Sequence, residues 1–195
     1  MTAITSLASI HKKGIFGNHH KKNEVELLKI SEVKALNIIQ IVQYKSSTIG
    51  TENINIDGIK LPEQNLAVNL NEKTRIFWNG PKTWLVVSQK ESIINMVKVS
   101  CNDKDFAITD ISHSRAIIQI EGNGATEILK KGCPINFNEL KKNNCVGSVF
   151  HGINILVDKI DDKPEKYNIF ALRSFGESFY HDITDAALEN GYVGV

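Results

Sequence analysis

The sequence predicts an α+β fold in which antiparallel or mixed sheets carry helices on one face. From about residue 106 the elements read β, β, α, β, β, β, α, and the part before them reads as strands, a hairpin and one helix. Short runs rich in Ile and Val are typical of strands, and other stretches repeat apolar residues at helical spacing. No Pro-, Gly- or Ser-rich linker interrupts these elements, so we expect one continuous core.

Residues 1–22 are expected to form an N-terminal arm, and residues 23–195 a single domain with lobes at about 23–104 and 105–195. The arm is basic and weakly periodic, and its apolar pair Ile15-Phe16 has no local partner. We therefore expect the arm to lie against its own domain or against a partner chain. The arm's histidines favour a solvated basic segment over a metal site, because adjacent His residues do not easily converge on one ion.

In the first half of the chain, strands are expected at 25–30 and 36–44, the second buried on both sides. The apolar runs 76–78 and 84–87 flank Asn79-Gly80-Pro81, which predicts a hairpin. Trp78 and Trp84 lie on either side of this turn. They could form an aromatic platform for a ligand, but packing in a core or an interface is the favoured interpretation.

A helix is expected to follow this hairpin at about 89–99. Ser88 and Glu91 have the spacing of a capping box at its start. Polar residues from Asn102 onward end it, and a strand at 106–109 follows.

In the second half, a strand at 115–121 leads through the turn Gly122-Asn123-Gly124 into a helix, with Asn123 as the expected N-cap. Gly132 is expected to supply a left-handed stop, and Pro134 forbids continuation. Strands at 145–150 and 153–160 predict a hairpin around His151-Gly152, followed by a strand at 167–172. Ser174 to Glu177 has the pattern of a second capping box, for a helix that Gly191 ends.

Composition excludes several classes of function. The 195 residues are 42% hydrophobic and 23% charged with a net charge of +1, so no electrostatic field favours nucleic acid or a membrane surface. No run approaches the ~18 apolar residues of a membrane span, and the N-terminus lacks the pattern of a secretory signal. The three cysteines contain no CxxC pair, which favours reduced thiols and a cytoplasmic protein.

The densest polar cluster is Asp110, Ser112, His113 and Arg115, at the start of a strand. A Ser-His-Asp triad needs its groups to converge from separate elements, so we reject a hydrolase. An Asp110–Arg115 tie, or a bond from Ser112 to the backbone, is the preferred interpretation. Cys133 has no activating partner in the sequence and is expected to be a buried apolar group.

The glycine-rich turn at 122–124 could present amides to an anion at a helix start, but a plain structural turn is preferred. No P-loop, GxGxxG, GxSxG or HExxH motif occurs. From the residues alone, the chain is expected to lack a catalytic set of its own.

Several motifs in a fixed order resemble the gamma subunit of heterotetrameric sarcosine oxidase. They are Trp78-Asn-Gly-Pro81 with Trp84-Leu85, Ile108 to Arg115, Ile120-Glu-Gly122 with Ala125, Ile128-Leu129, Gly132-Cys-Pro134 and Leu172-Arg-Ser-Phe175. The resemblance covers roughly residues 75–195, and before them mainly a GIFG-like segment at 14–17.

This resemblance implies a fold like the folate-binding domain of the glycine-cleavage T-protein, with two ferredoxin-like lobes. It implies a complex that oxidatively demethylates sarcosine to glycine, passes the one-carbon unit to tetrahydrofolate and produces hydrogen peroxide. FAD, FMN, NAD, zinc and tetrahydrofolate are expected in the alpha, beta and delta subunits and no cofactor in this chain. The implied role is that of a non-catalytic structural subunit that packs mainly on alpha.

No residue is therefore expected to be catalytic, cofactor-binding or metal-ligating. The residues expected at a partner interface, or as the family's signature, are Phe16, Trp78, Gly80, Pro81, Trp84, Asp110, Ser112, His113, Arg115, Gly122, Gly132, Cys133, Pro134, Arg173, Ser174 and Phe175. Two alternatives remain: a stand-alone folate-binding aminomethyltransferase-like or folate-dependent repair protein, and a small-molecule module that uses the tryptophan surface.

Overall fold

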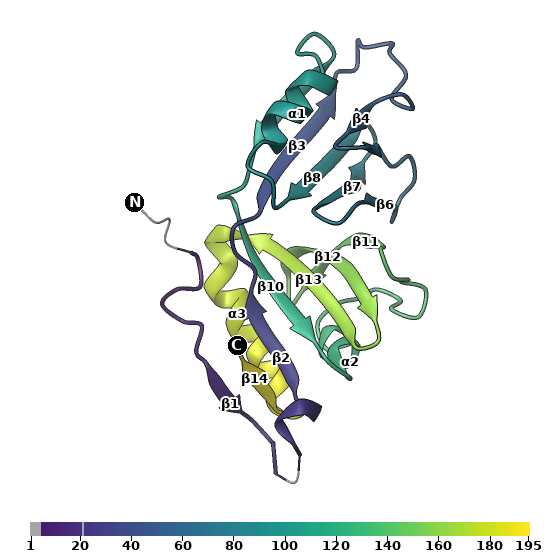
Figure 1. Cartoon of the computed structure of the whole chain (residues 1–195). Helices are drawn as coiled ribbons and strands as arrows, with labels where there is room; N and C mark the ends of the chain where they lie inside the picture. The colour runs from purple at the N-terminus through teal and green to yellow at the C-terminus, as the bar shows by residue number, and fades with distance from the viewer. Residues whose placement is uncertain (1–4, 21) are drawn as a thin grey trace. The chain divides into compact units, whose positions relative to one another are not determined.

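The structure, a computed structural model, describes residues 5–20 and 22–195 (Figure 1). The chain divides into two compact units: one combines Met1–Lys34 with Ser114–Val195, and the other is Ala35–His113. Each unit combines a sheet with at least one α-helix, so the expected α+β class is confirmed.

The first unit is built on a seven-stranded sheet in the order β1-β14-β2-β10-β13-β12-β11. Its strands are β1 (Gly14–Phe16), β2 (Leu28–Glu32), β10 (Arg115–Glu121), β11 (Cys145–Phe150), β12 (Ile153–Asp162), β13 (Glu165–Leu172) and β14 (Tyr192–Gly194). All neighbours are antiparallel except β14 and β2, which are parallel. Strands from both ends of the sequence therefore lie side by side, as the purple and yellow segments of Figure 1 show.

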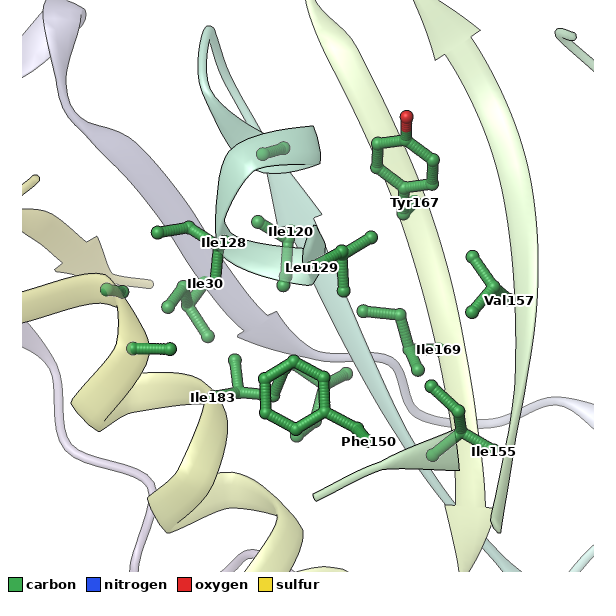
Figure 2. Packing of buried hydrophobic residues seen from close by; sticks show 14 of the residues in the cluster. Ile30, Ile120, Ile128, Leu129, Phe150, Ile155, Val157, Tyr167, Ile169 and Ile183 are labelled. Carbon is green, nitrogen blue, oxygen red and sulfur yellow. The ribbon is translucent and has the colours of Figure 1, made fainter. Parts of the chain in front are cut away.

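Two α-helices, α2 (Ala125–Lys130) and α3 (Gly176–Leu188), cover one face of this sheet, and 3₁₀ turns lie at Glu24–Glu26 and Arg173–Phe175. Figure 2 shows the layer between them: Ile128 of α2 and Ile183 of α3 pack with Ile120 and Ile169 of the sheet. These four side chains are fully buried, and burial of an Ile stabilises the fold by about 1.5–3 kcal/mol. Alternate residues of the central strands, such as Ile118 and Ile120, thus face this core.

The second unit holds a five-stranded sheet in the order β6-β7-β8-β3-β9, with a short β4–β5 pair. Its elements are β3 (Asn37–Gln43), β4 (Asn55–Ile56), β5 (Ile59–Lys60), β6 (Val68–Leu70), β7 (Thr74–Gly80), β8 (Thr83–Ser88), α1 (Ile93–Ser100) and β9 (Phe106–Asp110). The consecutive residues Ile38 and Ile39 of β3 are each 1% exposed, which confirms a strand buried on both faces. Ile93 and Val97 of α1 pack on the side of Ile39.

The expected border near residue 104 differs from the observed division. Strand β2 pairs with β10 and β14 of the second half of the chain, so residues 28–32 belong to the first unit. The parallel β2–β14 pair joins segments far apart in sequence, so local periodicity cannot predict it.

The described part of the arm packs on its own unit, which is one of the two expected alternatives. Leu7 is fully buried in the core, and the Phe16 ring stacks on Tyr192 with ring centroids 5.2 Å apart. His11 lies 3.0 Å from the hydroxyl of Tyr180. Residues 1–4 and 21 of the expected arm lie outside the described residues.

The three expected side-chain N-caps are wrong. Helix α1 begins at Ile93, four residues after the predicted position, and Ser88 lies outside it: its hydroxyl bonds Thr74 within the sheet and accepts the Lys90 amide at 3.1 Å in the turn before the helix. Helix α2 has Gly124 rather than Asn123 as its N-cap, with φ at +95°. Helix α3 follows a 3₁₀ turn and makes no side-chain cap bond from Ser174.

Both predicted hairpins form, although one turn shifts. His151 and Gly152 have φ of 45° and 87°, as a two-residue turn with both central residues left-handed requires. In the other hairpin the turn lies at Pro81-Lys82 rather than 79–81. A bulge between Trp78 and Gly80 places Asn79 as the extra residue, which moves the turn.

Candidate functional site

Hydrogen bonds fix the conformation of the Asp110–Ser112 segment of the polar cluster at the end of β9. The Asp110 carboxylate accepts bonds from the Ser112 amide at 2.9 Å and from its hydroxyl at 2.5 Å. The Ser112 hydroxyl also accepts a bond from the Ile38 amide at 2.9 Å, at the start of β3. The serine oxygen thus joins two strand ends, and the expected bond from Ser112 to the backbone is present.

The surroundings of Asp110 favour the ionised form of its carboxyl group. The bonds from the hydroxyl and amide of Ser112 hold the pKa of the Asp110 carboxyl below its ordinary value. His113 is exposed. Arg115 is the first residue of β10 in the first unit, and burial lowers the pKa of its guanidinium. Nothing in the described geometry aligns Asp110, Ser112 and His113 as a nucleophile, base and orienting acid.

The glycine turn before α2 already has an internal acceptor for its first-turn amide. Glu165 accepts bonds from the amide of Thr126 at 3.0 Å and from its hydroxyl at 2.7 Å. A carboxylate of the same chain therefore occupies the place where an anion would bind. Gly122 has φ of +129°, and a side chain there would also approach the backbone of Leu28. These contacts support the interpretation of residues 122–124 as a structural turn over that of an anion-binding site.

Gly132 is not a left-handed stop, which corrects the prediction. Helix α2 ends at Lys130, and Gly132 is absent from the residues with positive φ. A Cβ at Gly132 would lie 2.9 Å from the ring of Phe150, so close packing requires glycine there. The neighbouring Cys133 is buried, and burial raises the pKa of its thiol to about 11, while Pro134 is exposed. At neutral pH this thiol is protonated and weakly nucleophilic.

The two tryptophans of the hairpin differ in their surroundings. Trp84 is buried in the core beneath α1, and its indole N–H donates to the Pro62 carbonyl at 2.8 Å. Trp78 is its direct cross-strand partner but is only half-buried. Gly80 and Pro81 follow at the half-buried and exposed tip. Trp84 therefore packs a core, as favoured, and is not free to form a ligand platform.

The segment after β13 is the most exposed of the signature motifs. Leu172 is 39% exposed and Phe175 is 48% exposed, with the exposed residues Arg173 and Ser174 between them. An aromatic ring so open to water contributes little to its own fold. Aromatic side chains, unlike single aliphatic ones, are enriched at interfaces, so Phe175 is a candidate contact with another molecule.

The sequence reading missed a polar cluster in the second unit. The Asp57 carboxylate pairs with the Lys90 ammonium and accepts bonds from the Thr74 hydroxyl at 2.6 Å and the Asn71 amide group at 3.0 Å. The bond from Lys90 is the largest cause that lowers the pKa of Asp57 to about 2. The cluster joins a loop, β7 and the segment after β8. Asp57, Thr74 and Lys90 are too far apart in sequence for any motif, and the local signal is the Asp57-Gly58 pair, which is typical of a turn and in which Asp57 has a positive φ.

Within residues 5–20 and 22–195, no group of three or more His, Cys, Asp or Glu residues could hold a metal ion. Cys101, Cys133 and Cys145 are buried and form no disulfide bond. No helix among the described residues is long and apolar enough to cross a bilayer.

Comparison with solved structures first defines the class of fold. The chain superposes on the glycine cleavage system aminomethyltransferase T of Bartonella henselae with a TM-score of 0.60 and 9% identity, over 82% of this chain and 46% of that chain. The expected T-protein-like fold is confirmed.

A second solved structure gives a fuller match. The chain superposes with a TM-score of 0.81 and 18% identity on a chain of the heterotetrameric sarcosine oxidase from Corynebacterium sp. U-96, solved in complex with pyrrole 2-carboxylate. The match covers 97% of both chains.

In sequence, the chain is similar to sarcosine oxidase gamma subunits. It is 24% identical over 119 residues to that of Corynebacterium sp. strain U-96, which is 60% of this chain and 57% of the relative. It is 24% identical over 136 residues to that of strain P-1, which is 68% of this chain and 66% of the relative. The aligned part thus spans about three fifths to two thirds of these relatives. No model of a known protein family matches the chain. The resemblance drawn from the motifs is confirmed.

Proposed function

We propose that this chain is a non-catalytic structural subunit of a heterotetrameric sarcosine oxidase. The observation that carries the proposal is the fold match over 97% of both chains, together with similarity to gamma subunits. The assembled complex oxidatively demethylates sarcosine to glycine, passes the one-carbon unit to tetrahydrofolate and releases hydrogen peroxide. In this proposal the chain contributes to that oxidoreductase by assembly.

The chemistry of the signature residues supports a structural role. The side chains of Asp110 and Ser112 hold the turn after β9 and bind it to the Ile38 amide at the start of β3. Cys133 is buried with a raised pKa, and Trp84 is part of a core. Groups used in this way hold a fold together and do not need to reach a substrate.

In this proposal, FAD, FMN, NAD, zinc and tetrahydrofolate belong to the alpha, beta and delta subunits, and alpha provides the main contact. Buried cysteines that form no disulfide bond suit a reducing cytoplasm. Phe175 and the residues before it are the part of the signature best placed to meet a partner, because they are exposed.

Co-expression tests the proposal. The chain is expressed alone and with the alpha, beta and delta chains of a sarcosine oxidase, and the products are separated by size-exclusion chromatography. We expect this chain to elute with the flavin-containing complex and to show no binding when titrated alone with tetrahydrofolate. Binding of tetrahydrofolate by the lone chain at micromolar concentration would instead favour the stand-alone folate protein.

A matched pair of variants tests the exposed signature segment. Phe175→Ser removes an exposed aromatic side chain, and Val99→Ser removes an apolar side chain that is 88% exposed on α1. We expect Phe175→Ser to weaken assembly by about thirtyfold or more, the size of an interface hot spot, with Val99→Ser close to wild type. Equal assembly of the two variants would remove Phe175 from the interface.

A further inference from the structure

Strand β9 is an open edge of the sheet in the second unit. It is the last strand in the order β6-β7-β8-β3-β9, and β3 is its single neighbour among the strands that the structure describes. An edge strand presents unpaired backbone donors and acceptors, which another chain can use to add a strand.

Hydrogen bonds at the two ends of β9 fix which residues face β3. The amide of Tyr44 donates to the carbonyl of Asp105 at 2.8 Å, and the amide of Ile111 donates to the carbonyl of Ile38 at 2.8 Å. In an antiparallel pair the bonded residues alternate along each strand. The odd-numbered residues of β9 therefore bond with β3.

The even-numbered residues point their backbone groups away from β3. The Phe106 amide is taken by the carbonyl of Asn102 at 3.0 Å, which leaves the carbonyl of Phe106 and both groups of Ile108 and Asp110 facing outward. With a rise of about 3.4 Å per residue, the groups of Ile108 and Asp110 repeat every ~6.8 Å. That spacing matches the backbone of an extended chain.

A hollow of about 740 Å³ lies beside this edge. It is lined by Tyr44, Lys98, Cys101, Asn102, Asp103, Phe106, Ala107 and Ile108. Tyr44 is 40% exposed, and Ile108 is partly buried against the core under α1. The lining of Phe106, Ile108 and Cys101 is apolar and lies on the α1 side of the strand.

We propose that an extended segment of a partner subunit adds to the outer edge of β9 as a further strand. Its backbone bonds the outward groups of Ile108 and Asp110, and one apolar side chain on its α1 side enters the hollow. Main-chain bonds and an alternate side-chain pocket are the two components of strand addition. The inference rests on the proposed function and locates one contact of the complex.

Amide hydrogen exchange tests the edge directly. It is measured with single-residue resolution for the full chain alone and for the chain within the complex obtained by co-expression. Alone, the amides of Ile108 and Asp110 should exchange fast, while those of Ala107 and Thr109 are protected by β3. In the complex, exchange at Ile108 and Asp110 should slow by at least about tenfold, because an interstrand bond must open first.

A pair of variants at one position tests the same bond through assembly. Ile108→Pro removes an outward N–H that makes no bond to β3, and proline is tolerated at edge strands in that orientation. Ile108→Val keeps the N–H and the apolar contact. We expect Ile108→Pro to weaken assembly by at least about fivefold, in line with one lost hydrogen bond, and Ile108→Val by less than about twofold. Circular dichroism and thermal unfolding of both complexes control for folding.

The outcomes separate this inference from the proposed function. A complex that forms with unchanged exchange at Ile108 and Asp110 would overturn the strand addition and leave the structural subunit in place. Absence of any complex would overturn both. Protection of these amides in the chain alone, together with a dimer in size-exclusion chromatography, would make a second copy the occupant and overturn the inference.

Discussion

Replacement of Asp57 by Asn should reduce stability in a pH-dependent way. Asp57 has φ of +57°, a conformation that Asn also tolerates, so the backbone is kept while the charge is lost. Its side chain is 9% exposed and pairs with Lys90, so the charge is little screened by water. The variant therefore tests the contribution to stability of the ion pair with Lys90 and of the hydrogen bonds that Thr74 and Asn71 donate to the carboxylate.

The magnitude follows from the lowered pKa of Asp57. A fall from 3.8 to about 2 corresponds to about 2.5 kcal/mol of stability, at about 1.36 kcal/mol per pKa unit. Because the folded pKa lies below the unfolded value, this stabilisation is complete well above pH 4 and is lost as the pH falls toward 2. The difference between wild type and Asp57→Asn should be about 2.5 kcal/mol at pH 7, about 1.3 at pH 3 and about 0.4 at pH 2.

Urea unfolding of both proteins at these pH values, followed by tryptophan fluorescence, measures the difference. Asp103→Asn, which removes an exposed carboxylate of the same unit, is the control for a simple change in net charge. A difference between wild type and Asp57→Asn that stays constant from pH 7 to pH 2 would refute the reasoning, because it would show that the charge of Asp57 does not stabilise the fold.

Three further predictions follow from packing. Trp84→Ala should lower the free energy of unfolding by about 3–5 kcal/mol and reduce the yield of assembled complex. Turnover per flavin should be unchanged in the complex that does form, as activity normalised to flavin content would show. Gly132→Ala should destabilise by about 1–3 kcal/mol through its contact with Phe150, whereas Gly147→Ala, with open space at its Cβ, should change the thermal midpoint little. The raised pKa of Cys133 predicts alkylation at pH 8 at least about 100-fold slower in the native chain than in urea, measured by mass spectrometry; equal rates would contradict its burial.

The sequence predicts the fold best where neighbours in sequence are neighbours in space. The strand at 115–121, the turn after it and helix α2 follow from local periodicity and glycine placement. The hairpin at His151-Gly152 follows from its turn residues. The position of β2 beside β14 could not be predicted, because that pair is set by tertiary packing and by no local pattern.

The same limit applies to the polar residues. Asp110 and Ser112 are close in sequence, and their role in the turn could be predicted. Asp57, Thr74 and Lys90 meet only because a loop folds back onto β7 and the end of β8, and no spacing rule connects them. The predicted Ser88 cap is wrong for a related reason, since Ser88 is the last residue of β8, bonds Thr74 in the sheet and lies before the helix that begins at Ile93.

In the proposed function, this chain supports a sarcosine oxidase complex without taking part in its chemistry. Turnover per flavin of the assembled complex, measured with Asp110, His113 or Arg115 each replaced by Ala, tests it most directly. The account predicts turnover within about twofold of wild type for every complex that assembles. Because loss of a catalytic acid or base costs about 10²-fold or more, a fully assembled variant with turnover reduced to that extent would contradict it.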